Sequence, residues 1–288
     1  MERLLISNSK ESTACCDDNC CTTVAPAKDL KKAIKEKYTD IAEGREISCC
    51  EGTCCVGPED VSMADSYTNI AGYEKDADLN LGCGLPTQFA LIEKGDVVVD
   101  LGSGAGNDCF VARHETGETG KVIGVDITEA MIQKARRNVF KLGYNNVEFV
   151  HGDIENIPLP ENVAEVVVSN CVFNLVPDKA KAFKETFRIL KPGGHFSISD
   201  VVTIGELPEK LQGDVELYVG CVAGAVQKVN YLQTIQEAGF KNLKLQKEKR
   251  IEIPLELVRQ FCSEEEMNQY LRGEIGIYSV TVYAEKPE

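Results

Sequence analysis

From Asp96 onward, short apolar runs alternate with segments of helical periodicity. The runs DVVVDL (96–101), KVIGVD (121–126), VEFV (147–150), AEVVVSN (164–170) and HFSISD (195–200) have the length and composition of buried strands. The segments between them predict helices over 107–114, 127–143 and 178–190, the last ended by Pro192 and Gly193 of LKPGG. This alternation is typical of an α/β fold, in which helices cover both faces of a mostly parallel sheet.

The flanking segments extend this pattern in both directions. Toward the carboxyl end, the sequence predicts a helix over 229–239, a strand over 241–249 and a last strand over 275–285. Residues 28–42 place apolar side chains at helical spacing, which predicts an amphipathic helix that ends near Gly44 and packs on something larger. We therefore expect a cysteine-rich segment with one helix over 1–64 and an undivided α/β domain over 65–288.

Composition excludes several classes of protein. With 43% hydrophobic and 27% charged residues, the 288-residue chain is ordinary for a globular protein. Its 31 basic against 46 acidic residues give a net charge of −15, which disfavours nucleic acid as a partner. The first 25 residues carry no apolar signal region, and no later run approaches the roughly 18 apolar residues of a membrane helix. These features predict a soluble protein of the cytoplasm.

Thirteen cysteines are many for a cytoplasmic chain, and the number is odd. Reduced thiols in such a setting more often indicate soft-metal or redox chemistry than structural disulfides. Eight of them form a repeat, CCDDNCC (15–21) and CCEGTCC (49–55). These clusters suit thiophilic ions such as zinc, copper(I) or trivalent arsenic. The alternative is a redox-labile tail without a specific ligand.

A glycine-rich loop, DLGSGAGND, follows the first strand of the domain and leads into a helix. Its glycines, Gly102, Gly104 and Gly106, allow backbone amides at a helix amino terminus to approach a ligand. Asn107 breaks the usual dinucleotide pattern, because the third glycine arrives one residue early. Asp126 ends the second strand, where a carboxylate can accept hydrogen bonds from both hydroxyls of a ribose.

A pair of residues that follows the third strand is a candidate for binding a nucleobase. Asp153 is placed to meet the edge of an adenine while Ile154 covers its face. For Asp153 alone, the alternative is a helix cap or a turn.

The strings DLGSGAGND, GVD, GDIENIPLP and LKPGG together resemble the S-adenosylmethionine-dependent methyltransferases over residues 65–288. The resemblance implies a Rossmann-like, seven-stranded sheet with a reversed last strand. It also implies the roles of the donor-binding residues: the three glycines approach the methionine part, Asp126 holds the ribose, Met131 packs on the adenosine, Asp153 and Ile154 bind adenine, Asp100 positions the glycines, and Asn170 lines the donor pocket.

Three single cysteines are expected at the mouth of that pocket. Ligands of open α/β sheets bind beyond the carboxyl ends of the strands, and Cys171 directly follows the fourth strand. Cys83 lies between two glycines in LGCGLP, and Cys221 follows the fifth strand. Three thiolates suit a soft, three-coordinate centre, whereas a structural zinc ion prefers four ligands. For Cys171 alone, the alternative is a small buried hydrophobic residue.

The strings LGCGLP and SNCVFNLVPDK and the VGC context resemble arsenite methyltransferases. The resemblance implies that Cys83, Cys171 and Cys221 bind As(III) and that its lone pair attacks the donor methyl group. It further implies a disulfide between Cys55 and Cys83 that returns two electrons, with Cys54 as the other choice for Cys55. Thioredoxin or glutathione would then reset the enzyme, with methylated arsenicals as products of arsenic detoxification. Larger members of the family carry a sizeable domain after the last strand, which we do not expect in this chain.

The remaining candidates carry less chemistry. Cys109 and Cys262 lie beside apolar residues and are expected to pack. The three histidines are dispersed, which argues against a hydrolase or a zinc protease. Two rival functions stay open: methylation of a small organic acceptor, and a non-catalytic thiol-rich binder of metalloid or zinc.

Overall fold

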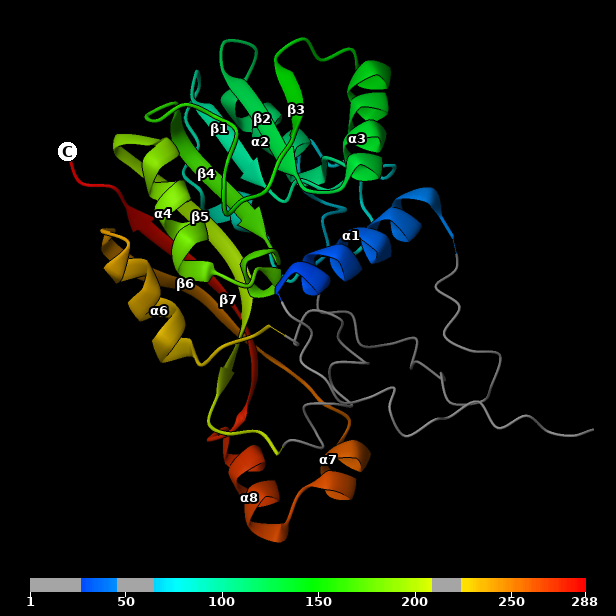
Figure 1. Ribbon diagram of the computed structural model, residues 1–288, viewed down its shortest axis with the longest axis vertical. Helices are drawn as coiled ribbons and strands as arrows, with labels where there is room; N and C mark the ends of the chain where they lie inside the picture. Colours follow the sequence, from blue (N-terminus) through cyan, green and yellow to red (C-terminus); the bar gives the residue numbers. More distant parts are fainter. Residues whose placement is uncertain (1–26, 46–64, 209–223) are drawn as a thin grey trace, which may run out of the picture.

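The computed structural model describes residues 27–45, 65–208 and 224–288, and within them one seven-stranded sheet has the order β3-β2-β1-β4-β5-β7-β6 (Figure 1). Within the described residues, six strands of the sheet point in the same direction, and β7 is antiparallel to both of its neighbours, β5 and β6. The reversed β7 therefore agrees with the predicted class. The strand bounds are β1 Val97–Leu101, β2 Lys121–Asp126, β3 Val147–His151, β4 Ala164–Asn170, β5 Leu190–Ile204, β6 Lys241–Ile251 and β7 Gly276–Glu285.

The central strands are apolar on both faces because helices cover both. Alternate residues such as Val98 and Val166 pack against α2 (Asn107–Thr116) and α3 (Glu129–Leu142). The residues between them, such as Val99 and Val167, enter a second cluster beneath α4 (Lys179–Ile189) and α6 (Lys228–Glu237). Continuous valine runs are therefore stable in β1 and β4, since neither face meets water.

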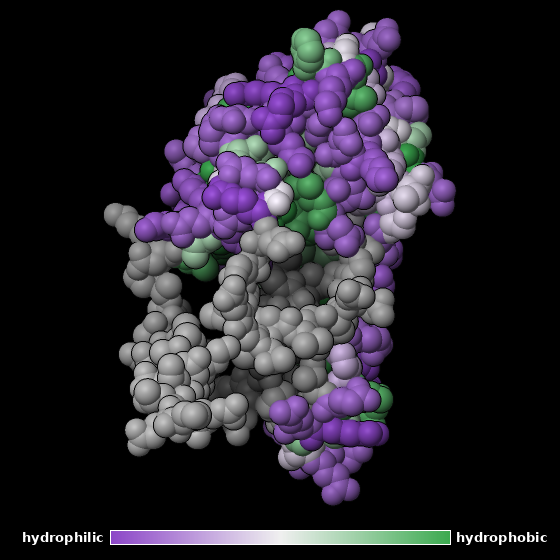
Figure 2. All heavy atoms as spheres, turned by 90° about the vertical axis from the view of Figure 1, so that its right-hand side faces the viewer, coloured by the Kyte–Doolittle hydropathy of each residue, from purple (hydrophilic) through white to green (hydrophobic). Residues whose placement is uncertain are grey.

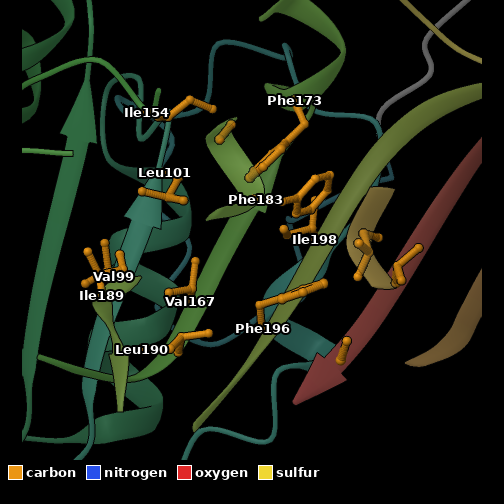
Figure 3. Close-up of a cluster of buried hydrophobic side chains, with 14 of the residues drawn as sticks. Val99, Leu101, Ile154, Val167, Phe173, Phe183, Ile189, Leu190, Phe196 and Ile198 are labelled. Atoms are coloured by element: carbon orange, nitrogen blue, oxygen red, sulfur yellow. The ribbon is translucent and has the colours of Figure 1, made fainter. Parts of the chain in front are cut away.

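Aromatic rings fill the second cluster, whose side chains Figure 3 shows against the strands of the sheet. Phe173 and Phe183 stack with ring centroids 4.4 Å apart, and Tyr231 meets Phe183 edge-on at 5.5 Å. All three rings are almost completely buried. This packing fixes α4 and α6 on the sheet next to the carboxyl end of β4.

One expected boundary was wrong. LKPGG does not separate a helix from a strand, because α4 ends at Ile189 and β5 begins at Leu190. Leu190 already pairs with Ala164, and regular pairing to β4 resumes at His195 after a shift in register. Gly193 adopts a left-handed conformation with φ +75° in between. Pro192 and Gly193 therefore form an irregularity inside the strand.

Beyond the fifth strand the structure adds elements that the sequence patterns did not predict. β5 continues to Ile204, and two helices, α7 (Leu255–Phe261) and α8 (Glu264–Arg272), connect β6 to β7. Figure 1 shows both helices below the extended ends of β5 and β7. Val258 of α7 and Tyr270 of α8 pack against Val201 and Ile277 in a third apolar cluster. This cluster continues the core past the carboxyl end of β5.

The predicted amino-terminal helix is present as α1 (Ala27–Glu43), followed by Gly44 at φ +67°. It packs against α3 and crosses the end of the sheet (Figure 1). No helix among the described residues is both long and apolar enough to cross a bilayer. In the view of Figure 2, hydrophilic residues cover most of the coloured surface, and hydrophobic ones gather near its centre.

Candidate functional site

A cleft of about 1080 Å³, part of it open to solvent, lies at the carboxyl ends of the parallel strands. The strand order reverses between β1 and β4, and ligands of such sheets bind outside this switch point. Of the predicted donor-binding residues, all but Gly106 line the cleft: Asp100, Gly102, Gly104, Asp126, Met131, Asp153, Ile154 and Asn170. Cys171 lines it as well.

The glycine-rich loop shapes the floor of the cleft. Gly104 has φ +52° and no neighbouring atom within 4 Å of where a Cβ would stand, so its backbone faces open space. Gly102 has φ +75°, and a Cβ there would come within 2.2 Å of Val172, the residue after Cys171. Gly106 serves another purpose, because it begins α2 and packs against Phe110 and Phe149.

Asp126 is held by the same loop. Its Oδ2 accepts the Gly104 amide at 2.9 Å, and its Oδ1 accepts the Thr128 amide at 2.8 Å. Burial raises the pKa of Asp126, and these two backbone bonds oppose that shift. The carboxylate is thus fixed at the end of β2, where it lines the cleft.

The floor also contains a buried hydroxyl and further carboxylates. Ser103 is 7% exposed, and its hydroxyl has no hydrogen-bond partner among the described residues. Asp100 and Asp108 both line the cleft, and none of the ion pairs found in the described residues involves either one. Burial raises the pKa of Asp100 well above its usual value, so the floor combines carboxyl groups with an unused hydroxyl and suits a polar ligand such as S-adenosylmethionine.

Helix α1 forms a wall of the cleft that sequence patterns did not assign to it. Its Lys31, Ile34 and Tyr38 line the cleft, and the Lys31 ammonium lies 2.6 Å from both Asp153 and Glu155. Although burial opposes the shift, the Lys31 hydrogen bond lowers the pKa of Asp153. The one signal in the sequence was the apolar face that Ile34 and Tyr38 share.

Cys171 stands at the end of β4 in a strained conformation. Its φ is +62°, in the left-handed region that residues other than glycine rarely adopt, and its side chain is 3% exposed. The Cys171 amide donates to the Ser199 carbonyl at 2.8 Å, which holds the turn against β5. Backbone strain of this kind persists where the surroundings fix it and is frequent at functional sites.

The glycines around Cys83 allow its backbone to lie directly against β4 and β5. A Cβ on Gly82 would come within 2.7 Å of the Asn170 side chain, and one on Gly84 within 2.6 Å of Ser199. The Cys83 amide donates to Asn170 Oδ1 at 3.0 Å. The LGCG string therefore brings Cys83 against Asn170, the residue before Cys171.

The cysteines occupy different environments. Cys83 and Cys171 belong to one apolar cluster, the third cluster that α7 and α8 cover. Cys109 is buried in α2 and donates to Asp100 at 3.2 Å, whereas Cys262 is half-buried after α7. Cys55, Cys221 and the two vicinal clusters lie outside the described residues. Among the residues that the structure describes, no group of three or more histidine, cysteine or acidic side chains is arranged to hold a metal ion.

The sheet order, the glycine loop and the carboxylate at the end of β2 define a class I S-adenosylmethionine-dependent methyltransferase. A family of methyltransferase domains matches residues 92–239. The chain is an enzyme of this class, and S-adenosylmethionine is its methyl donor.

Within that class, the chain belongs to the arsenite methyltransferase family. It is 36% identical over 297 residues to an arsenite methyltransferase of Halobacterium salinarum. The match covers 97% of this chain and 73% of that protein. It is 38% identical over 168 residues to the human arsenite methyltransferase, of which it covers 44%. A crystal structure of an arsenic(III) methyltransferase from Chlamydomonas reinhardtii is 33% identical, covers 78% of this chain and 72% of that one, and superposes with a TM-score of 0.60.

Proposed function

We propose that this enzyme transfers a methyl group from S-adenosylmethionine to trivalent arsenic held by cysteine thiolates. The observation that carries the proposal is the convergence of two thiol-bearing segments at the donor cleft. Cys171 lines the cleft. The Cys83 amide donates a hydrogen bond to Asn170, the residue before Cys171, although Cys83 and Asn170 lie 87 positions apart in the sequence. A purely structural role for these two thiols does not require this placement.

The donor binds with its ribose on Asp126, its adenine beside Ile154 and Asp153, and its methionine part over Gly102 and Gly104. Met131 is completely buried and supplies an apolar surface for the adenosine. Asp100 lies beneath the glycines, and Gly106 sets the start of α2. This arrangement directs the sulfonium methyl group toward the end of β4, where Asn170 and Cys171 lie.

Arsenic binds to Cys83, Cys171 and Cys221, the last from outside the described residues. Three thiolates leave the As(III) lone pair free to attack the methyl carbon, and the carbon–sulfur bond of the sulfonium breaks with its electron pair left on sulfur. The apolar neighbours of Cys83 and Cys171 exclude water from the attacking centre. Because the attacking lone pair carries no proton, no general base is needed, and alignment of the two reactants supplies most of the rate enhancement.

Methyl transfer raises arsenic formally from the trivalent to the pentavalent state. Two thiolates then form a disulfide, for which we propose Cys83 with Cys55 or the adjacent Cys54, and their two electrons return arsenic to the trivalent state. A thiol reductant, thioredoxin or glutathione, reduces this disulfide and completes the cycle. The proposed setting is detoxification of arsenic in the cytoplasm.

Incubation of the protein with arsenite, S-adenosylmethionine and a thiol, followed by arsenic speciation, tests this function. We expect methylated arsenicals to appear in step with S-adenosylhomocysteine. Methylation of quinones or other small organic acceptors without any methylated arsenic would support a different acceptor. Bound zinc and the absence of any methyl transfer would support a non-catalytic thiol-rich binder.

A further inference from the structure

Asp108 is an anionic group of the cleft that the mechanism above does not use. It lies in the first turn of α2, lines the cleft and has no ion pair among the described residues. Burial raises its pKa to about 6, and hydrogen bonds from Tyr67 and Asn170 oppose that shift. At that pKa most of the Asp108 carboxyl is ionised at neutral pH, and this half-buried charge has no cation beside it among the described residues.

The hydroxyl of Tyr67 joins this carboxylate to the thiol side of the site. Its Oη lies 2.8 and 2.9 Å from the two Asp108 oxygens and 2.7 Å from Asn170 Nδ2. Because Asn170 Nδ2 is a donor, the phenol accepts from Asn170 and donates its own proton to Asp108. Tyr67 is 5% exposed, and burial raises the pKa of its phenol well above the ordinary value, so the proton stays in place.

Asn170 extends the same series of bonds to Cys83. Its Nδ2 also donates to the Gly84 carbonyl at 2.9 Å, and its Oδ1 accepts the Cys83 amide at 3.0 Å. The Asn170 amide thereby holds the Cys83 amide and the Gly84 carbonyl, one residue further along the chain. A continuous series of hydrogen bonds thus runs from Asp108 through Tyr67 and Asn170 to Cys83.

The donor offers one group that matches Asp108. Its methionine part ends in an α-ammonium, a compact cation with three N–H donors, and we have proposed that this part lies over the glycine loop next to α2. On the basis of that proposed function, we propose that Asp108 binds the α-ammonium group of the donor and that Tyr67 is the positioning residue that couples this contact to Cys83. Donor binding then fixes the backbone around Cys83 before arsenic binds.

The first arm of the test needs no arsenite. S-Adenosylhomocysteine and its desamino analogue are titrated by calorimetry into the unmodified protein, Asp108→Asn and Glu115→Gln, an exposed charge change on the same helix. We expect the unmodified protein and Glu115→Gln to bind S-adenosylhomocysteine about tenfold or more tightly than the desamino analogue, since this is the typical loss for a charged hydrogen bond. In Asp108→Asn the two affinities should differ by less than about threefold. The contact would be overturned if all three proteins showed the same ratio of affinities for the two ligands. It would also be overturned if Asp108→Asn lost affinity for both ligands to the same degree.

The second arm measures the coupling. Arsenite affinity is determined with and without saturating S-adenosylhomocysteine for the unmodified protein, Tyr67→Phe and Tyr73→Phe. Tyr73 is the matched control, because its ring stacks on Tyr67 at 6.5 Å and its hydroxyl bonds to Asp78. We expect the nucleoside to tighten arsenite binding about fivefold or more in the unmodified protein and in Tyr73→Phe, and less than about twofold in Tyr67→Phe.

The outcomes separate this inference from the proposed function. Full coupling in Tyr67→Phe would overturn the role of Tyr67 while arsenite binding itself stands. Absence of arsenite binding in the unmodified protein would contradict both the proposed function and the coupling to Cys83. The amine discrimination of the first arm would still decide the Asp108 contact.

Discussion

The donor cleft and the thiol cluster lie side by side yet differ in chemical character. The cleft is lined by carboxylates that backbone amides, Lys31 or a phenol hold in place. The thiols of Cys83 and Cys171 instead lie among aliphatic and aromatic side chains such as Val201, Ile251 and Tyr270. One side therefore suits a polar cation, and the other suits a soft atom that must lose its water.

The two regions meet at the end of β4. Asn170 lines the cleft and bonds to Cys83, while Cys171, the next residue, lines the cleft and belongs to the apolar cluster. The strained turn at Cys171 produces this change of environment within two residues. We therefore expect a substitution in one region to leave the other region's affinity for its own ligand largely unchanged when that ligand binds alone.

The largest effect is expected on the thiol side, from Cys171→Ser. Serine keeps the size and the backbone bond to Ser199 but removes the soft ligand, so arsenite methylation should fall about 100-fold or more. Affinity for S-adenosylhomocysteine should stay within about threefold, as calorimetry can check. Full arsenite turnover by this variant would refute the thiolate mechanism.

The matching change on the donor side is Asp126→Ala. It removes the two acceptor oxygens proposed for the ribose. One bond to a charged group contributes about 1.5–3 kcal/mol, so loss of even one of them should lower donor affinity about 10- to 100-fold. Arsenite affinity in the absence of donor should not change. Loss of arsenite binding to the same degree would show that the two regions are not separate.

A smaller effect is expected from pH, through Asp108. Its pKa of about 6 means that lowering the pH from 7 to 5 protonates most of the carboxylate, so S-adenosylhomocysteine affinity should fall about tenfold. Asp78, Asp100 and the Tyr67 phenol are the other ionisable groups that act on Asp108. Asp108→Asn should flatten this profile, and an unchanged profile in that variant would assign the effect to a neighbour.

The smallest effect concerns the wall that α1 provides. Lys31→Met removes the ion pairs to the partly exposed Asp153 and to the buried Glu155, so the KM for the donor should rise about three- to tenfold with less change in kcat. Lys32→Met is the control, because its side chain is 75% exposed and pairs with Glu36 on α1 itself. Equal kinetics for the two variants would mean that α1 does not contribute to donor binding.

Local sequence predicted the donor half of the fold closely, for a physical reason. β1, β2 and β4 are buried on both faces, so their apolar runs end where the strands end, and the glycine loop and Asp126 follow within a few residues. The extension of β5 and the helices α7 and α8 were not predicted. Glu264–Arg272 is strongly polar, and its main signal was the capping box of Ser263 and Glu266.

The residues of the site likewise fall into those that local sequence could predict and those that it could not. Asp126 and the glycine loop could be predicted because one strand–loop–helix unit positions them. The contacts of Asn170 with Tyr67 and Cys83 join residues 103 and 87 positions apart, and Lys31 meets Asp153 across 122 positions. Such contacts arise only when the sheet has assembled, so no local pattern indicates them.

X-ray absorption spectroscopy of the arsenite complex, with S-adenosylhomocysteine bound, tests the central claim most directly. We expect three sulfur neighbours and no oxygen around arsenic in the unmodified protein, and two sulfurs in both Cys83→Ser and Cys171→Ser. An arsenic atom whose sulfur coordination is the same in all three proteins would contradict the convergence of these thiols on the donor methyl group.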